Sequence, residues 1–78
     1  MYDVLGIDDS EGRQVRLSGQ QDYDRALEAA EVLTATSIDN DSSWRWCVKL
    51  GKIVVATFEQ WREPITGQLV VKKTVIVS

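Results

Sequence analysis

The 78-residue sequence contains no histidine, a single cysteine and a single proline. Without a histidine, neither Cys47 nor a serine has the usual general base for nucleophilic catalysis. One cysteine cannot close an internal disulfide, and the histidine and cysteine ligands of a structural zinc site are missing. The sequence therefore predicts a non-enzymatic protein with no cofactor and no metal site, stabilised by packing alone.

Carboxylates that lie close together in the sequence are the remaining candidates for acid–base chemistry. Asp8 is next to Asp9, and Glu59 precedes Glu63 by four residues. Such chemistry requires one carboxylate with a raised pKa in a dry cleft. Both pairs fall in expected turns or at strand ends, so we interpret them as solvated turn charges.

Long apolar segments are absent as well. No stretch approaches the roughly 18 apolar residues that cross a bilayer, and the start of the chain lacks the basic and apolar regions of an export signal. We therefore expect a cytoplasmic protein with no membrane partner, located in the host-cell cytoplasm if it is viral. With 44% hydrophobic residues and only five glycines, residues 1–78 should fold as a single domain.

Residue alternation and helical spacing predict an α+β fold in the order ββαβββ, with one amphipathic helix packed on a mainly antiparallel sheet. Apolar residues at one-face spacing predict a helix from Asp22, its N-cap, to about Thr36. The acidic residues and glycine of segment 8–12 predict a hairpin connection before it. The five expected strands cover residues 2–7, 13–17, 44–50, 52–61 and 69–77.

The third and fourth strands are expected to form a hairpin with two distinct faces, joined by a two-residue turn at Leu50 and Gly51. One face would carry Trp44, Trp46, Val48, Ile53, Val55 and Trp61. The other would carry Arg45, Cys47, Lys49, Lys52, Val54, Ala56 and Phe58. The alternation of Trp44, Trp46 and Val48 fits a strand that faces the helix, and the alternative places one or more tryptophans at an interface. The sequence leaves open which sheet face the helix covers. One helix covers one face, so the other face of the sheet should be exposed and partly apolar.

Charge is distributed unevenly along the chain. Residues 1–41 contain ten carboxylates and three arginines, whereas residues 42–78 contain six basic residues and two carboxylates. On the predicted helix, Asp24, Glu28 and Glu31 lie within roughly 60° of one another. This acidic stripe is either a solvated helix face or a partner-binding surface that imitates the phosphates of nucleic acid.

Basic and aromatic residues form a second candidate surface. Its members are Arg45, Lys49, Lys52, Trp61 and Arg62, with Lys72 and Lys73 expected nearby. Tryptophan and arginine supply many binding hot spots in protein interfaces. The surface is either a solvated sheet face, with lysines protecting strand edges, or one that follows the phosphates of single-stranded nucleic acid.

In small size, acidity, absence of catalytic residues and helix-on-sheet layout, the chain resembles the small phage-encoded anti-CRISPR proteins. That group shares no common motif, so the resemblance is one of overall character. It implies non-enzymatic inhibition by masking a nucleic-acid-binding surface of a multi-subunit CRISPR effector complex. Our first hypothesis is therefore a protein that occludes a surface of a larger host complex. The second, of a different class, is a weak single-strand nucleic-acid-binding module, and the sequence leaves a homodimer open.

Overall fold

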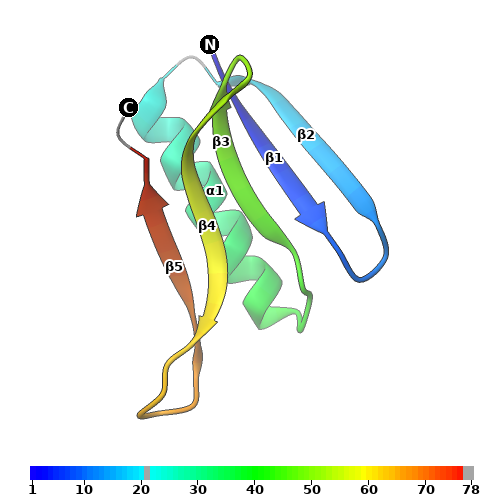
Figure 1. The fold of residues 1–78 in the computed structure, drawn as a ribbon, viewed down its shortest axis with the longest axis vertical. Coiled ribbons are helices and arrows are strands. Elements are labelled where there is room, and N and C mark those ends of the chain that lie inside the picture. The colour runs from blue at the N-terminus through cyan, green and yellow to red at the C-terminus, as the bar shows by residue number, and fades with distance from the viewer. Residues whose placement is uncertain (21, 77–78) are drawn as a thin grey trace.

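The structure, a computed structural model, describes residues 1–20 and 22–76. It confirms the α+β prediction: five antiparallel strands form one sheet in the order β2-β1-β3-β4-β5, and one helix packs on it (Figure 1). The elements are β1 (Tyr2–Asp8), β2 (Arg13–Gln20), α1 (Tyr23–Asp39), β3 (Arg45–Leu50), β4 (Ile53–Arg62) and β5 (Leu69–Val75). The predicted end of the last strand, Val77, lies outside the described residues.

Helix α1 begins as the sequence predicts and ends later. Asp22 is the N-cap, and its carboxylate accepts a hydrogen bond of 2.9 Å from the backbone N–H of Asp24. The helix continues past the predicted end at Thr36 to Asp39. Ser37 is buried in this last part, and its hydroxyl donates to the carbonyl of Leu33. Packing against the sheet therefore extends the helix through a polar segment that local preference assigns to a loop.

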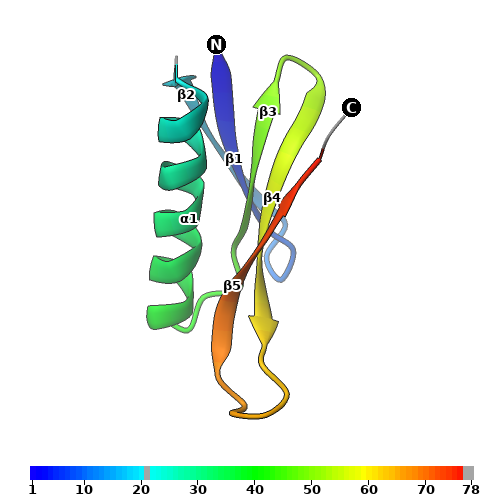
Figure 2. The same cartoon turned by 90° about the vertical axis from the view of Figure 1, so that its left-hand side faces the viewer.

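The hydrophobic core lies between α1 and the sheet, because the helix covers only one face (Figure 2). Val4, Val48 and Phe58 are fully buried strand residues of this core. Ala26 and Ala30 are fully buried on α1, and their small side chains let the helix lie close to the strands. Each buried valine or phenylalanine stabilises the fold by about 1.5–3 kcal/mol.

Two tryptophans belong to this core, as the alternation of β3 predicts. The Trp46 side chain is buried, and Trp44 packs against the core from its margin. Their rings stack with centroids 5.8 Å apart. The structure therefore places Trp44, Trp46 and Val48 on the helix side of the sheet, the orientation that their alternation favours.

The β3–β4 hairpin differs from its predicted register in two ways. Leu50 pairs with Ile53, so the turn consists of Gly51 and Lys52. Gly51 has a φ of 63°, a conformation that favours glycine. Farther along β4, the pairing with β3 shifts by one residue at Val55, which forms a β-bulge.

Beyond the bulge, the side chains of β4 lie on the side of the sheet opposite to the predicted one, because one extra residue reverses their alternation. Ala56 and Phe58 are fully buried beneath α1. The prediction that they share the face of Arg45 is therefore wrong. Trp61, predicted to lie on the same face as Trp46, lies instead on the face that the helix leaves uncovered.

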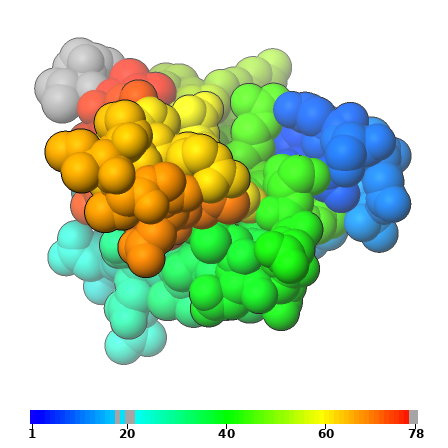
Figure 3. All heavy atoms as spheres, turned by 90° about the horizontal axis from the view of Figure 1, so that it is seen from below, coloured from blue at the N-terminus to red at the C-terminus, as the bar shows by residue number. Residues whose placement is uncertain are grey.

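Helix α1 does not extend over the edge strand β2. Val15 and Leu17 pair with helix-side residues of β1, yet they are 41% and 39% exposed. In the space-filling view, the blue β1–β2 hairpin lies to one side of the cyan and green helix (Figure 3). The molecule is thus two layers thick at its centre and one layer thick at this edge.

Candidate interaction surfaces

The outer side of α1 carries the three carboxylates that the sequence singles out. Asp24, Glu28 and Glu31 are all exposed, opposite the buried alanines of the same helix. We call these three residues the acidic helix face. Further exposed carboxylates lie at the two ends of the helix, at Asp22, Asp39 and Asp41. Arg25 is the one basic residue in segment 22–41.

No close ion pair neutralises the acidic helix face within the described residues. The four ion pairs found there join Arg13 to Asp8 and Glu11, Arg16 to Asp3, and Arg45 to Asp9. All of them lie on the first three strands and the β1–β2 connection. The helix therefore presents several like charges to solvent, and their field extends about 8 Å at physiological salt.

The opposite side of the sheet, which faces the viewer in Figure 1, is not covered by the helix, and we call it the open sheet face. At its centre, Leu5 pairs with Cys47, and Cys47 pairs with Thr57. Ile7 and Val54 extend this group to either side, and all five residues are only partly buried. We call Leu5, Ile7, Cys47, Val54 and Thr57 the apolar strip.

Four cations surround the apolar strip. Arg45 and Lys49 lie on either side of Cys47 along β3. Arg16 of β2 pairs with Leu5, and Lys72 of β5 lies opposite Glu59. We call Arg16, Arg45, Lys49 and Lys72 the cationic rim.

Two carboxylates share the open sheet face with these cations. Asp3 forms an ion pair with Arg16 at 3.1 Å, and Glu59 lies opposite Lys72 without a close contact. Arg45 pairs with Asp9 at 3.1 Å, but both side chains are well exposed, at 48% and 72%. Exposed pairs of this kind contribute about 0–1 kcal/mol, so Arg45 can exchange this partner for another. The face is net positive on a chain whose net charge is -3.

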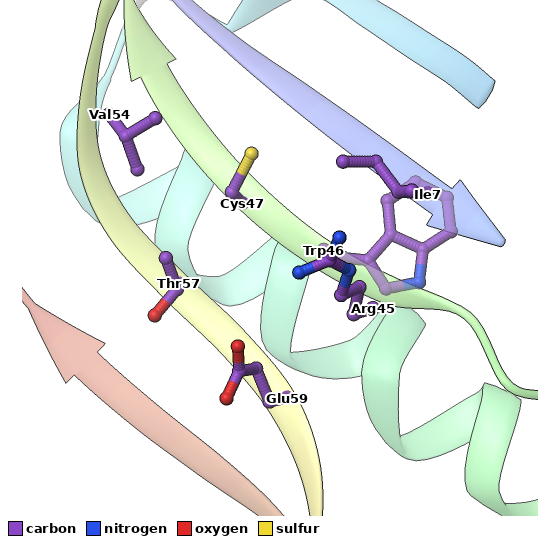
Figure 4. Close-up of a pocket in the computed structure, with 7 residues that line it drawn as sticks. All are labelled: Ile7, Arg45, Trp46, Cys47, Val54, Thr57 and Glu59. Carbon is purple, nitrogen blue, oxygen red and sulfur yellow. The ribbon is translucent and has the colours of Figure 1, made fainter. Parts of the chain in front are cut away.

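A shallow pocket of about 200 Å³ opens on this face. Its lining comes from β1, β3 and β4, with α1 behind the strands (Figure 4). The residues that line it are Ile7, Arg45, Trp46, Cys47, Val54, Thr57 and Glu59. Burial raises the pKa of the Cys47 thiol above its ordinary value of 9.0, and the positive charges of Lys49 and Arg45 offset part of that effect. The thiol is therefore protonated at neutral pH.

The other predicted residues of the basic and aromatic surface do not gather at this pocket. Lys52 lies in the β3–β4 turn, away from Arg45 and Lys49. Trp61 is on the open sheet face, 43% exposed, but at its far end opposite Val70. The candidate surface is therefore split rather than continuous.

The pairing of β4 with β5 places Arg62 and Lys73 on the helix side of the sheet, so neither belongs to the open sheet face. The Arg62 guanidinium donates to the carbonyl of Gly67 and closes the wide β4–β5 connection. Lys73 pairs with the buried Phe58 on the helix side. Of the three basic residues expected near the hairpin face, only Lys72 lies on it.

The interpretation of Asp8 as a solvated turn charge is wrong, because this residue is only 3% exposed. Its carboxylate accepts hydrogen bonds from the hydroxyls of Ser10 at 2.6 Å and Ser43 at 2.9 Å, and from the Arg13 guanidinium at 3.3 Å. The Ser10 bond is the main reason that the pKa of Asp8 is lowered from 3.8, and burial opposes it. Asp8 thus joins the β1–β2 connection to the segment before β3.

Glu63, of the second carboxylate pair, also has a lowered pKa. Its carboxylate accepts from the backbone N–H groups of Ile65 at 3.0 Å and Thr66 at 2.8 Å, and the Ile65 bond contributes most. A general acid needs a pKa shifted in the opposite direction. Asp8 and Glu63 therefore act as acceptors that order two turns.

Sequence reasoning missed Arg16 and the β1 residues of the apolar strip. The signal was present, because Leu5 and Ile7 alternate with the buried Val4. Their importance depends on which strands flank β1, and the position of β1 between β2 and β3 is not visible in local patterns.

The fold and its two charged surfaces define a small α+β protein. A scan against protein-family models and searches of curated proteins and of solved structures return no match. In the described part of the chain, no helix is long and apolar enough to cross a membrane. No cluster of three or more potential metal ligands occurs among the described residues either.

Proposed function

We propose that this chain is a non-enzymatic binding protein that occludes a basic, nucleic-acid-binding surface of a larger protein complex. The acidic helix face makes the first contact and competes with nucleic acid for the same cations. The observation that carries the proposal is the grouping of Asp24, Glu28 and Glu31 on one exposed side of a helix, with no close ion pair to any residue that the structure describes.

Charge at this position has a physical advantage for such a role. A helix fixes the spacing of the backbone positions that carry its carboxylates, so the backbone is already ordered before binding. Complementary charge raises the association rate and excludes partners of like charge. Solvated acidic helices are common, and what distinguishes this one is that none of its three carboxylates forms a close ion pair with any described residue, although Arg25 lies on the same helix.

The partner that the anti-CRISPR resemblance implies is a multi-subunit CRISPR effector complex. Such a complex holds guide and target strands in basic channels, which an acidic helix face could fill. The lowered pKa values of Asp8 and Glu63 leave neither carboxylate suited to general-acid catalysis. The split of the basic residues removes the continuous cationic surface that the nucleic-acid alternative would use.

The test uses purified multi-subunit effector complexes of several subtypes and their target duplex DNA. Each complex is incubated with the protein, and DNA binding is followed by electrophoretic mobility shift. The wild-type chain should prevent DNA binding by at least one complex. The variant Glu28→Lys/Glu31→Lys should require at least about tenfold more protein, since a loss of about 1.4 kcal/mol is tenfold in affinity.

A matched control carries the same change of charge away from the helix. Glu11 and Glu59 are exposed carboxylates outside α1, and Glu11→Lys/Glu59→Lys should inhibit nearly as well as the wild type. If neither the wild type nor any variant affects a complex of the panel, the CRISPR assignment is wrong. If both double variants inhibit equally, the acidic helix face is not the contact surface.

A further inference from the structure

The open sheet face combines an uncovered apolar centre with a positive border. The apolar strip spans β1, β3 and β4, and none of its five residues is fully buried. The helix packs its buried side on the core of the other face and leaves the open sheet face uncovered (Figure 1). Contiguous apolar surface that is rimmed by polar residues is typical of a protein interaction site.

Charge complementarity selects the kind of partner. The cationic rim contributes four positive charges, Asp3 and Glu59 contribute two negative charges to the same face, and Asp9 adds a third negative charge beside Arg45, so the balance stays positive. A symmetric dimer through this face would place the same net positive patch on both sides, which is unfavourable. A partner that presents carboxylates around an apolar contact satisfies both features.

The placement of aromatic rings argues against nucleic acid as the occupant. Surfaces that bind single strands stack bases on exposed aromatic side chains. Trp44 and Trp46 pack on the helix side, and among the described residues Trp61 is the aromatic side chain on the open face, distant from the strip. Trp46 lines the pocket but is buried, so the centre of the face exposes only the aliphatic, thiol and hydroxyl groups of the strip and offers a base no ring to stack on.

We propose that the open sheet face is a second docking surface, which binds an acidic amphipathic segment of a protein partner. Apolar side chains of that segment lie along the apolar strip, and one of them enters the pocket between Ile7, Cys47 and Val54. Its carboxylates pair with Arg45 and Lys49, which flank the pocket. The proposal is independent of the proposed function, because it concerns the face of the molecule opposite the acidic helix face.

The first experiment identifies and locates a ligand. A phage-displayed library of random peptides is selected on the immobilised full chain, and the enriched peptides are synthesised. They should have a net negative charge and apolar residues at helical spacing, as peptides that bind grooves do. When they are titrated into the isotope-labelled protein, amide NMR shifts should change mainly at the apolar strip.

The second experiment measures the contribution of the cationic rim. Arg45→Glu/Lys49→Glu should weaken the selected peptide at least about tenfold, which is the fold-change that about 1.4 kcal/mol represents. The matched control Lys52→Glu/Lys73→Glu has the same change of charge at exposed positions off this face, and its affinity should stay within about threefold of the wild type, a difference of less than 1 kcal/mol. Thermal unfolding of both variants confirms that they fold.

The other outcomes overturn the proposal. Selection of no peptide, or of basic or uncharged peptides, excludes an acidic partner. Shift changes confined to α1 place the binding site on the wrong face. Shift changes at the apolar strip with an oligonucleotide, or with increasing protein concentration alone, assign the face to nucleic acid or to a second copy. None of these results bears on inhibition through Glu28 and Glu31, so failure here is distinct from failure of the proposed function.

Discussion

The indole of Trp46 lies directly over Gly6, its cross-strand neighbour on β1. A Cβ atom at Gly6 would stand 2.5 Å from Cζ3 and 2.6 Å from Cη2 of that ring. Gly6 has no unusual backbone conformation, so the space that it leaves, rather than its flexibility, is what the fold requires. The absence of a side chain at one position on β1 is thus a condition for burying the largest side chain of β3.

Gly6→Ala should destabilise the protein by about 1–3 kcal/mol, because the Trp46 ring must move away from its packed position. Urea unfolding followed by tryptophan fluorescence measures the change. The control Gln14→Ala alters an exposed position of the neighbouring strand and should change stability by less than about 0.5 kcal/mol. Equal stability of both variants would show that the ring does not depend on the space at Gly6.

The main elements of this fold were predictable because each has a clear local pattern. Apolar residues at helical spacing mark α1, and the alternation of Trp44, Trp46 and Val48 marks the segment that enters and forms β3 (Arg45–Leu50). The extension of α1 to Asp39 was not predictable, since it depends on burial of Ser37 beside Trp46. Local preference cannot report a contact between distant segments.

The candidate surfaces were also predictable only where they depend on local sequence patterns. The acidic helix face follows from helical spacing alone, and the structure places its three residues together. The open sheet face depends on strand order and on the bulge at Val55, so the sequence predicted Arg45 and Lys49 together and assigned Phe58 and Trp61 to the wrong faces.

Asp8 should make stability depend on pH in the acidic range. Its pKa is lowered in the folded chain from 3.8, mainly by the Ser10 hydroxyl. A lowered folded pKa stabilises the protein above the unfolded value, and this contribution is lost as the pH falls through the folded value. Asp8→Asn should therefore be less stable at neutral pH and should lose less stability between about pH 5 and pH 2.

Thermal unfolding at a series of pH values measures this difference. The control is Asp9→Asn, because Asp9 is exposed in the same connection and does not hold Ser43. That variant should follow the wild-type profile closely. Parallel profiles for Asp8→Asn and the wild type would contradict a stabilising role for the ionised Asp8 carboxylate.

Cys47 should react slowly with thiol reagents at neutral pH. Burial raises the pKa of this thiol, and the thiolate is the reactive form. Labelling with a chromogenic disulfide at increasing pH measures the rate, with a short unstructured peptide that has one cysteine as the reference. At neutral pH the rate for Cys47 should be lower than the rate for the peptide. The rate for Cys47 should also begin to rise at a higher pH than the rate for the peptide. A rate at neutral pH equal to that of the peptide would contradict the burial of Cys47 in the open sheet face.

Direct binding of nucleic acid is the alternative function. It predicts that the protein binds oligonucleotides at low salt, whereas the proposed protein-binding function predicts that it does not. We expect no binding of single- or double-stranded oligonucleotides at about 50 mM salt, because the chain is acidic overall and the apolar strip offers no stacking ring. Fluorescence anisotropy at two salt concentrations measures this. Binding that weakens with salt and is lost in Lys49→Glu, but kept in Lys73→Glu, would favour the alternative.

The bulge at Val55 makes the final third of the protein sensitive to length rather than to composition. The later residues of β4 and, through pairing, those of β5 take their side of the sheet from this one inserted residue, and they include Glu59, Trp61 and Lys72. Deletion of Val55 would turn Phe58 outward and Glu59 inward, or would leave the strand unpaired. Substitutions at neighbouring positions would not change which side of the sheet each side chain lies on. Insertions and deletions in β4 should therefore be far less tolerated than replacements.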